Sequence, residues 1–385
     1  MSNDLKEDLL NFNNTIPKIG WVTSWSFNCG ISGYSDRLIK YMDDQVTVFS
    51  PLKSNQPDNY AYKVIPTWSY PINDKQDLND LYEEILHNNI TTLVIQFNFT
   101  FFKFSEFKLF LHKIFKNGIY VSIFLHSTND PKNVTEKKLS TLSSAFKKVD
   151  RLLVHTPKDM NRLKSLDLVE NVSLFPHGII DSGLQPLINK SSKTKTISTF
   201  GFCLPNKGFS QLIKSIVLLN KKGYKFSLNM YTSIYNENYL FYYDKLVKLI
   251  HKEEANKFIK IDSEYKSDEI ILEELSKSDL IVLPYQSSGE SSSAAVRQAI
   301  ASLVPVAVTP LSIFDDVLPV VYKLPGISVE HISDGIIDFF NNNENLNKSN
   351  ISNNLGPWME QNSFSSLGYR LEEMIKSISN NKLII

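Results

Sequence analysis

The chain has 385 residues, of which 42% are hydrophobic, and 41 Lys and Arg residues balance 41 Asp and Glu residues. This length is too great for one ordinary hydrophobic core and fits two domains, and the zero net charge argues against a global electrostatic grip on nucleic acid. The two cysteines, Cys29 and Cys203, lie far apart without a CxxC pattern, which excludes a disulfide scaffold and a cysteine zinc site.

The first residues of the chain, 1–6, are polar and carry no apolar signal-peptide core. No stretch approaches the roughly 18 uninterrupted apolar residues that a membrane-spanning helix requires. We therefore expect a cytoplasmic protein.

Apolar runs and amphipathic stretches alternate along the first half of the chain. Strands are expected at 19–23, 46–50, 91–97, 119–125, 152–155 and 172–175, and helices at 35–42, 77–87, 104–116 and from 157 onward. This alternation predicts a parallel sheet wrapped by helices.

Two glycines, Gly30 and Gly33, lie in the loop expected after the first strand. Their spacing is not that of a GxGxxG dinucleotide motif, so it identifies no cofactor site. A tight turn with close helix packing explains them equally well.

A polar stretch at 187–196 is the expected linker between a first domain at 1–186 and a second at 197–360. In the second domain we expect strands at 197–200, 226–231, 258–261, 280–283 and 305–309, and helices at 209–220, 240–251, 268–278 and 294–303. The asparagine-rich segment 341–350 is expected to be a surface loop. A helix at 364–378, within residues 361–385, is expected to return to the first domain.

The segment 279–310 is the most informative part of the sequence. It combines a buried strand, a Ser/Gly loop at 287–293, a helix capped by Ser292 or Ser293, and a second strand. Free N–H groups and the positive end of the helix dipole suit a phosphate or diphosphate. Glu290 at the loop tip can reach a sugar hydroxyl, although a solvated turn is an equally weighted alternative.

A second candidate phosphate contact is Lys207 beside Gly208, at the start of the helix expected from residue 209. A Lys-Gly pair alone is more often a solvated turn. Together with the Ser/Gly loop of the same domain it favours a phosphate site. The loops 201–208, 231–233 and 287–293 are all expected at the carboxyl edge of the sheet, where ligands bind in such folds.

Several of these segments together resemble glycosyltransferase family 4, whose members are retaining enzymes. The similar segments are 200–208, 278–285, Gly289-Glu290 with 298–302, and 305–309. The resemblance implies the α/β GT-B fold, in which two Rossmann-like doubly wound domains face each other across a cleft. The sequence departs from the family at Gln298, where a second glutamate is usual, and at Phe202, where an arginine is frequent. Arg297 is an alternative cation for the diphosphate.

The resemblance also implies roles for individual residues. Three residues would act at the reacting centre. Glu290 would bind the sugar hydroxyls, His126 would lie near the reacting carbon, and Lys207 would hold the diphosphate. The donor-binding residues would be Gly201, Phe202, Lys207, Gly289, Ser291, Ser292, Ser293 and Gln298. Gly30 and Gly33 would allow close approach on the acceptor side. We expect Gln298→Glu to keep activity and to tighten donor binding, because a carboxylate binds ribose hydroxyls with charge assistance. His155 and His177 are expected to be structural.

No cofactor is expected. The sequence has no Asp-x-Asp pair and no HxxxH or HExxH spacing, so we expect a metal-independent reaction in which the nucleotide-sugar is a substrate. The absence of GxSxG argues against an α/β-hydrolase. A retaining transfer of this kind needs no protein nucleophile, because the departing diphosphate can take the acceptor's proton.

The resulting hypothesis is a hexosyltransferase that extends a surface polysaccharide. Its expected partners are a nucleotide-sugar donor and a glycan or lipid-linked glycan acceptor, but no nucleic acid. GDP-mannose is the first candidate for the donor. The segment 101–116 mixes phenylalanines with lysines, so peripheral contact with the inner face of the membrane is an alternative to packing on the sheet. A sugar-nucleotide epimerase and a non-catalytic glycan-binding or scaffold protein remain the rival functions.

Overall fold

A computed structural model describes residues 17–25, 29–42, 45–53, 62–132, 134–184, 193–234, 237–342 and 347–381. The chain divides into two compact units: unit 1 runs to Pro176 and resumes at Phe364, and unit 2 is His177–Ser363. Most of the expected linker, 187–192, lies outside the described residues, and its last two residues belong to a strand of unit 2.

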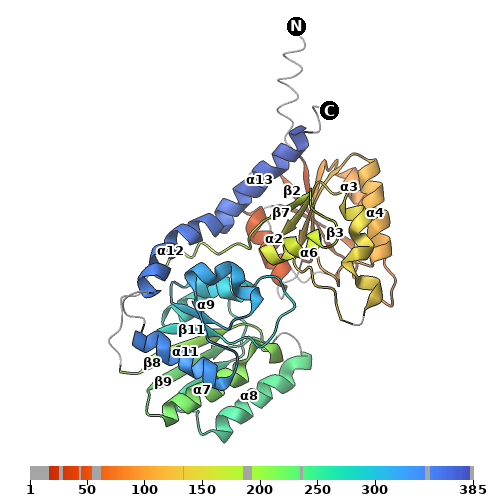
Figure 1. The fold of residues 1–385 in the computed structure, drawn as a ribbon. Coiled ribbons are helices and arrows are strands. Elements are labelled where there is room, and N and C mark those ends of the chain that lie inside the picture. Colours follow the sequence, from red (N-terminus) through yellow and green to blue (C-terminus); the bar gives the residue numbers. More distant parts are fainter. Residues whose placement is uncertain are drawn as a thin grey trace. The chain divides into compact units, whose positions relative to one another are not determined.

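Unit 1 contains a seven-stranded parallel sheet with the order β3-β2-β1-β4-β5-β6-β7 (Figure 1). Its strands are β1 (Ile19–Val22), β2 (Val46–Pro51), β3 (Lys63–Trp68), β4 (Thr92–Phe97), β5 (Tyr120–Leu125), β6 (Arg151–Val154) and β7 (Val172–Leu174). Its helices are α2 (Gly30–Ile39), α3 (Asn79–His87), α4 (Phe104–Lys116), α5 (Ser143–Phe146), α6 (Pro157–Lys164) and α13 (Phe364–Asn381).

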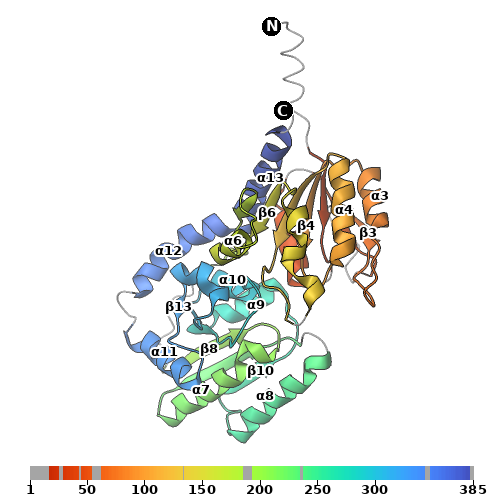
Figure 2. The same ribbon diagram turned by 45° about the vertical axis from the view of Figure 1, so that its right-hand side comes forward.

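Helices α3 and α4 cover one face of this sheet (Figure 2). Three phenylalanines of α4, Phe104, Phe107 and Phe110, are buried in that core and the fourth, Phe115, packs against it half-buried, while the lysines of α4 face solvent. The interpretation of 104–116 as a helix packed on the sheet is therefore correct, and these aromatic rings are not available to a membrane.

The last helix, α13, packs against α2 within unit 1. Gly368 permits the contact, because a Cβ there would lie 2.7 Å from the Cβ of Tyr41 and 3.0 Å from the carbonyl oxygen of Leu38. The rings of Phe364 and Tyr34 meet at 5.8 Å between centroids. The chain thus completes unit 1 with its C-terminal helix.

Unit 2 contains a six-stranded parallel sheet with the order β10-β9-β8-β11-β12-β13. Its strands are β8 (Lys195–Phe200), β9 (Phe226–Tyr231), β10 (Ile259–Asp262), β11 (Leu280–Leu283), β12 (Val306–Val308) and β13 (Tyr322–Lys323). Its helices are α7 (Phe209–Lys221), α8 (Leu240–Lys252), α9 (Asp268–Ser276), α10 (Ala294–Ala301), α11 (Val329–Asn342) and α12 (Asn347–Asn362), and a 3-10 segment spans Ser312–Val320.

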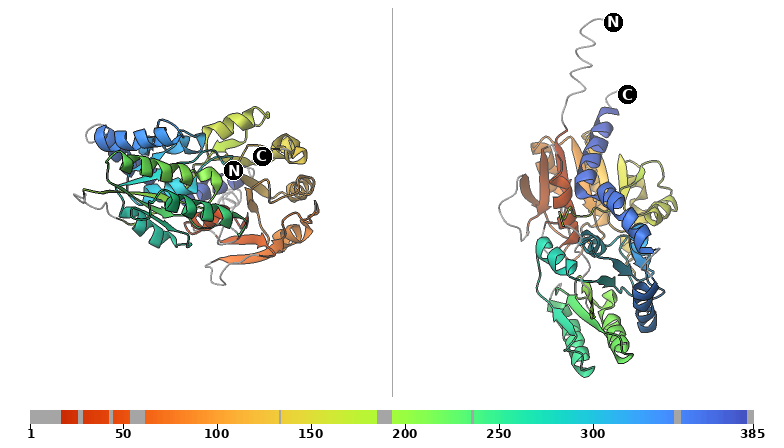
Figure 3. Two further views of the ribbon diagram at one scale, coloured as in Figure 1. Left: turned by 90° about the horizontal axis from the view of Figure 1, so that it is seen from below. Right: turned by 90° about the vertical axis from the view of Figure 1, so that its left-hand side faces the viewer.

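The two faces of this sheet are covered by different helices. Apolar side chains of α7, α8 and α11 form one core with the sheet, and α7 and α8 run alongside each other (Figure 3). Side chains of α9, α10 and the 3-10 segment form the other core. Because helices cover both faces of the sheet, a ligand can reach it only at the ends of the strands.

The predicted fold class, two α/β units with parallel sheets, is confirmed. Several local expectations differ from the structure, and β13 and α11 were not among the expected elements. Strand β3 was not expected, because Pro66 interrupts its pattern, and the structure places it at the sheet edge where a proline is tolerated. Helix α2 begins at Gly30 rather than Ser35. Helix α12 begins at Asn347, inside the segment expected to be a loop. Among the described residues, no helix is long and apolar enough to cross a membrane.

Candidate functional site

The candidate site lies where β8 and β11 pair side by side in the unit 2 sheet. From β8 the chain continues to β9 on one side, and from β11 it continues to β12 on the other, so their pairing is the topological switch point. Ligands of doubly wound sheets bind at the carboxyl ends of the strands at such a point. The loops that leave these two strands are 201–208 and 284–293.

Hydrogen bonds join the two loops. The N–H of Gln286 donates to the carbonyl of Asn206 at 2.8 Å, and the Asn206 amide donates to the carbonyl of Ser287 at 3.1 Å. The Gln286 amide donates in turn to the carbonyls of Pro284 at 2.9 Å and Ile327 at 3.0 Å. The loops therefore form one fixed surface.

Gly208 makes the contact between the loops sterically possible. It has a left-handed backbone with φ +76°, and a Cβ there would lie 1.8 Å from the carbonyl oxygen of Pro284. Gly208 is also the residue that precedes α7, whose first turn has no side-chain cap. Gly201, with φ +130°, begins the same loop. Glycines at these positions let the uncapped N-terminus of α7 approach the end of β11.

Lys207 is the cation that these loops present. Its Nζ lies over the ring of the buried Tyr285, 3.9 Å from the ring centroid. Burial by itself lowers the pKa of Lys207, but the Tyr285 oxygen and the Glu290 carboxylate outweigh it and raise the pKa above its usual value. Lys207 therefore keeps its charge at neutral pH.

The serine loop leads into α10 as the sequence predicts. Ser293 caps the helix by accepting a hydrogen bond from the N–H of Val296 at 3.3 Å. The hydroxyl of Ser292 donates to Asp316 Oδ2 at 3.0 Å, and Ser291 is buried. Glu290 is exposed at the tip, with its N–H donating to the hydroxyl of Ser288 at 3.1 Å. The serine hydroxyls thus shape the loop, and Glu290 projects from it together with Gly289.

Arg297 does not serve as an alternative cation for the diphosphate. Its guanidinium is 2% exposed, donates to the carbonyls of His177 at 2.8 Å and Ser293 at 3.0 Å, and pairs with Asp316. All three contacts lie within unit 2. Because Phe202, which is half-buried, also offers no charge, the diphosphate would depend on Lys207 and on backbone N–H groups.

Gln298 faces a carboxylate that the sequence analysis did not consider. Its amide nitrogen donates to Asp268 Oδ1 at 2.6 Å, across the N-terminus of α9. Both side chains are half-buried. A glutamate at position 298 would therefore meet a second carboxylate, and this reverses our expectation that it would improve the site.

We now expect Gln298→Glu to make stability depend on pH. Two carboxylates at this distance repel each other when both are ionised, so one native pKa rises above the unfolded value of about 4.3. The native variant then holds more protons than the unfolded chain, and its stability falls as pH rises through that raised pKa. Thermal unfolding should show little loss at pH 5 and a loss of about 1–2 kcal/mol at pH 7.5. Gln298→Met is the uncharged control, and an equal pH dependence in both variants would contradict this account.

In unit 1, the half-buried His126 begins a chain of hydrogen bonds at the end of β5. Its Nε2 lies 2.7 Å from Gln96 Oε1, its Nδ1 lies 3.2 Å from His155 Nε2, and His155 Nδ1 lies 3.0 Å from the carbonyl of Phe175. Burial, and then the neighbouring His155, hold the pKa of His126 well below its ordinary value. His126 is therefore a neutral imidazole at physiological pH.

Gly30 and Gly33 occupy the first turn of α2, not a loop before it. A Cβ at Gly30 would meet no atom within 4 Å, whereas one at Gly33 would lie 3.2 Å from the Arg37 guanidinium. Neither glycine has a positive φ. Of these two glycines, only Gly30 thus has no described residue close enough to occupy the space where a ligand could approach.

Three residues at the site were not found by sequence reasoning. They are Tyr285, which supports Lys207, and Asp316 and Asp268, which bind the side chains of Arg297 and Gln298. Tyr285 could have been found from its position at the end of a buried strand. The other two come from distant segments, and no spacing in the sequence connects them to α10. Among the described residues, no group of three or more His, Cys, Asp or Glu could hold a metal ion.

No family model matches the sequence, and no curated protein matches it. Solved structures match the fold over nearly the whole chain. A glycosyltransferase from Rickettsia africae is 12% identical with a TM-score of 0.76, covering 94% of this chain and 98% of that one. HepE from Anabaena, in complex with UDP and glucose, is 10% identical with a TM-score of 0.71, covering 94% and 100%. Sucrose-phosphate synthase from Thermosynechococcus elongatus is 12% identical with a TM-score of 0.64, covering 96% of each chain.

These likenesses define the class of fold. The protein has the GT-B fold, with the seven-stranded and six-stranded parallel sheets of glycosyltransferase structures. The resemblance noted in the sequence is therefore confirmed at the level of the fold. Because the sequences are only 10–12% identical, these structures show the fold alone, and the activity has to be inferred from the residues of this chain.

Proposed function

We propose that the protein is a retaining glycosyltransferase that moves a hexose from a nucleotide-sugar donor to a glycan or lipid-linked glycan. The observation that carries the proposal is the convergence of Lys207 and two helix N-termini, those of α7 and α10, at the switch point of unit 2. A diphosphate is the group that one fixed cation and the uncapped N–H groups of α7 suit best, with the dipole of the Ser293-capped α10 beside them. HepE, which shares the fold, was solved with UDP and glucose.

The proposed chemistry uses charge stabilisation on the leaving group. As the bond between sugar and diphosphate breaks, negative charge grows on the diphosphate oxygens, and Lys207 with the helix N-termini stabilises it. Glu290, exposed beside Lys207, binds the hydroxyls of the sugar. The diphosphate then takes the proton of the acceptor hydroxyl on the same face of the sugar, so the configuration is retained without a protein nucleophile.

We assign the donor to unit 2 and the acceptor to unit 1. In unit 1 the candidate for sugar contact is His126, whose neutral imidazole can exchange hydrogen bonds with a hydroxyl. Gly30 is the candidate for close approach of the acceptor. The two cysteines of the chain are free thiols, which supports a reducing cytoplasmic location.

We expect activity to survive EDTA. The sequence lacks an Asp-x-Asp pair, and Lys207 supplies at the diphosphate the positive charge that a metal ion supplies in metal-dependent enzymes. Turnover measured after extensive dialysis against chelator should match that of untreated protein. Loss of turnover on chelation, with recovery on adding manganese or magnesium, would contradict this prediction.

A panel of donors tests the proposal directly. Release of nucleoside diphosphate would be measured for UDP-glucose, GDP-mannose and related sugars, with and without glycan acceptors. GDP-mannose is the donor that the sequence analysis favours, and UDP-glucose is suggested by the ligands of HepE. Transfer supports the proposal. Conversion of one nucleotide-sugar into another would indicate the epimerase, and glycan binding without turnover would indicate the scaffold protein.

A further inference from the structure

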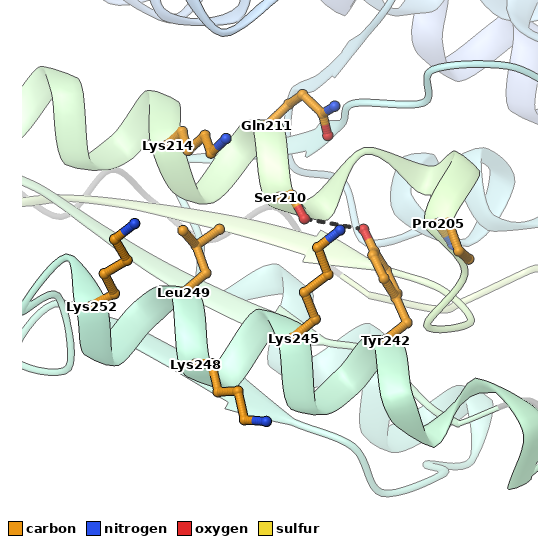
Figure 4. A pocket seen from close by; sticks show the side chains of 9 residues that line it. All are labelled: Pro205, Ser210, Gln211, Lys214, Tyr242, Lys245, Lys248, Leu249 and Lys252. Atoms are coloured by element: carbon orange, nitrogen blue, oxygen red, sulfur yellow. Dashed lines mark hydrogen bonds between the residues drawn. The ribbon is translucent and has the colours of Figure 1, made fainter.

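A groove between α7 and α8 of unit 2 is lined by lysines. It has a volume of about 450 Å³, and its nine lining residues include four lysines, Lys214, Lys245, Lys248 and Lys252, but no aspartate or glutamate. Lys245 and Lys252 extend from α8 toward α7, whereas Lys248 points away from α7 (Figure 4). The whole chain has no net charge, so this groove is a local concentration of positive charge.

The exposed face of α8 combines these lysines with a phenylalanine. Phe241, Lys245, Lys248 and Lys252 follow one another at intervals of four, three and four residues, which places them in one stripe along the helix. The opposite face of α8, with Tyr242, is buried in the core. The stripe is thus a solvent-facing surface and not part of the packing of unit 2.

The lysine ammonium groups are available to an external anion. Within the described residues, none of the four makes an ion pair with a carboxylate. The acidic residues beside these lysines at α8 are the exposed Asp244, four residues before Lys248, and Glu253, which is paired with Lys221 at 2.9 Å. The lysines along the groove and on the adjoining face of α8 outnumber these two carboxylates, and they therefore attract a ligand that carries several negative charges.

Exposed apolar side chains lie at the start of the same helix. Phe241 is 62% exposed and Leu240 is 47% exposed. A small soluble phosphate gains nothing from these side chains. A lipid surface, in contrast, takes up aromatic and aliphatic groups at the level of its headgroups while its phosphates bind lysines.

We propose that the groove between α7 and α8, with the stripe from Phe241 to Lys252, docks on an anionic lipid surface. Headgroup phosphates bind the lysines, and Phe241 and Leu240 enter the boundary between headgroups and acyl chains. Pro205 and the first turn of α7 place one end of the groove next to the loop of Lys207, whereas Phe241, Lys245, Lys248 and Lys252 extend along α8. Helix α4, whose aromatic side chains are mostly in the core, takes no part in this surface. The contact is peripheral and would bring the enzyme to acceptors that are anchored in the membrane.

Vesicle co-sedimentation of the full chain tests the proposal. Vesicles of phosphatidylcholine alone should not bind, whereas vesicles with about 30 mol% phosphatidylglycerol should bind and should release the protein in about 0.5 M salt. The triple variant Lys245→Gln/Lys248→Gln/Lys252→Gln should lose about 100-fold in affinity for these vesicles. Phe241→Ser should lose about 10-fold.

The matched control removes the same charge from the other amphipathic helix. Lys108→Gln/Lys113→Gln/Lys116→Gln on α4 should bind vesicles like the parent, and all variants should bind UDP or GDP like the parent, which verifies their folding. Normal binding by the α8 triple variant, or loss of binding by the α4 variant, would overturn the proposal.

Titration with inorganic diphosphate tests whether the groove binds a soluble anion instead. Saturable binding to the groove without vesicle binding would make it a soluble-anion site and would also overturn the proposal.

Discussion

Replacing Lys207 with alanine is expected to lower turnover by about 100-fold or more, the usual effect of removing one preorganised charge stabiliser. The reason is that Lys207 is the only cation of the two loops at the switch point, held at 3.9 Å over the ring of Tyr285. Its charge matters in the ground state as well, so the variant should also bind free UDP or GDP poorly. Calorimetric titration with the nucleotide and a transfer assay with the intact donor would measure both effects.

The variant Glu290→Ala distinguishes contacts with the sugar from contacts with the diphosphate. Because Glu290 is proposed to contact the sugar hydroxyls, its removal should lower turnover while free UDP or GDP binds almost normally. Lys222→Ala is the control for the loss of a positive charge in Lys207→Ala. Lys222 is an exposed lysine at the far end of α7, so its removal should leave nucleotide binding and turnover unchanged. If both the Lys207 and Glu290 variants bind and turn over like the parent, unit 2 does not hold the donor in these loops and the scaffold function is favoured.

Arg297→Ala is expected to destabilise unit 2 by about 3–5 kcal/mol, because it leaves the Asp316 carboxylate buried without its cation. The side chains of Arg297 and Asp316 are 2% and 10% exposed, and Asp316 Oδ1 has no hydrogen-bond partner among the described residues. The variant also loses the hydrogen bonds to His177 and Ser293, so the serine loop should lose its fixed position. Urea denaturation would give the change in the free energy of unfolding.

The control for Arg297 is another arginine–aspartate pair in a wetter environment. Arg162 pairs with Asp130 at 3.0 Å, with side chains 35% and 25% exposed. Arg162→Ala should cost no more than about 1 kcal/mol, as is usual for solvated pairs. If Arg297→Ala and Arg162→Ala lower the free energy of unfolding equally, burial is not the reason for the contribution of Arg297 to stability. The double variant Arg297→Leu/Asp316→Leu should recover part of the lost stability, since it removes both charges.

The alternation of apolar runs and amphipathic stretches predicted parallel sheets covered by helices, whereas the GT-B fold was implied by the resemblance to glycosyltransferase family 4. In a parallel sheet the strands are buried on both faces, so runs such as Leu280–Leu283 are continuous and easily recognised. Helix α10 and a cap at Ser292 or Ser293 were predicted because capping depends on neighbours within three residues, and the structure selects Ser293. Strand β3 was missed because its stability comes from pairing with β2 at the sheet edge, not from its own pattern.

The sequence by itself determined the class of fold, the capped serine loop and the placement of Lys207 beside a helix N-terminus, since these follow from local patterns. Only the tertiary structure decided how the conspicuous polar side chains are used. It joined Arg297 to Asp316, Gln298 to Asp268 and His126 to His155, and each pair links residues at least 19 positions apart. A buried polar group must find a partner wherever the fold brings one, and sequence spacing carries no information about such contacts.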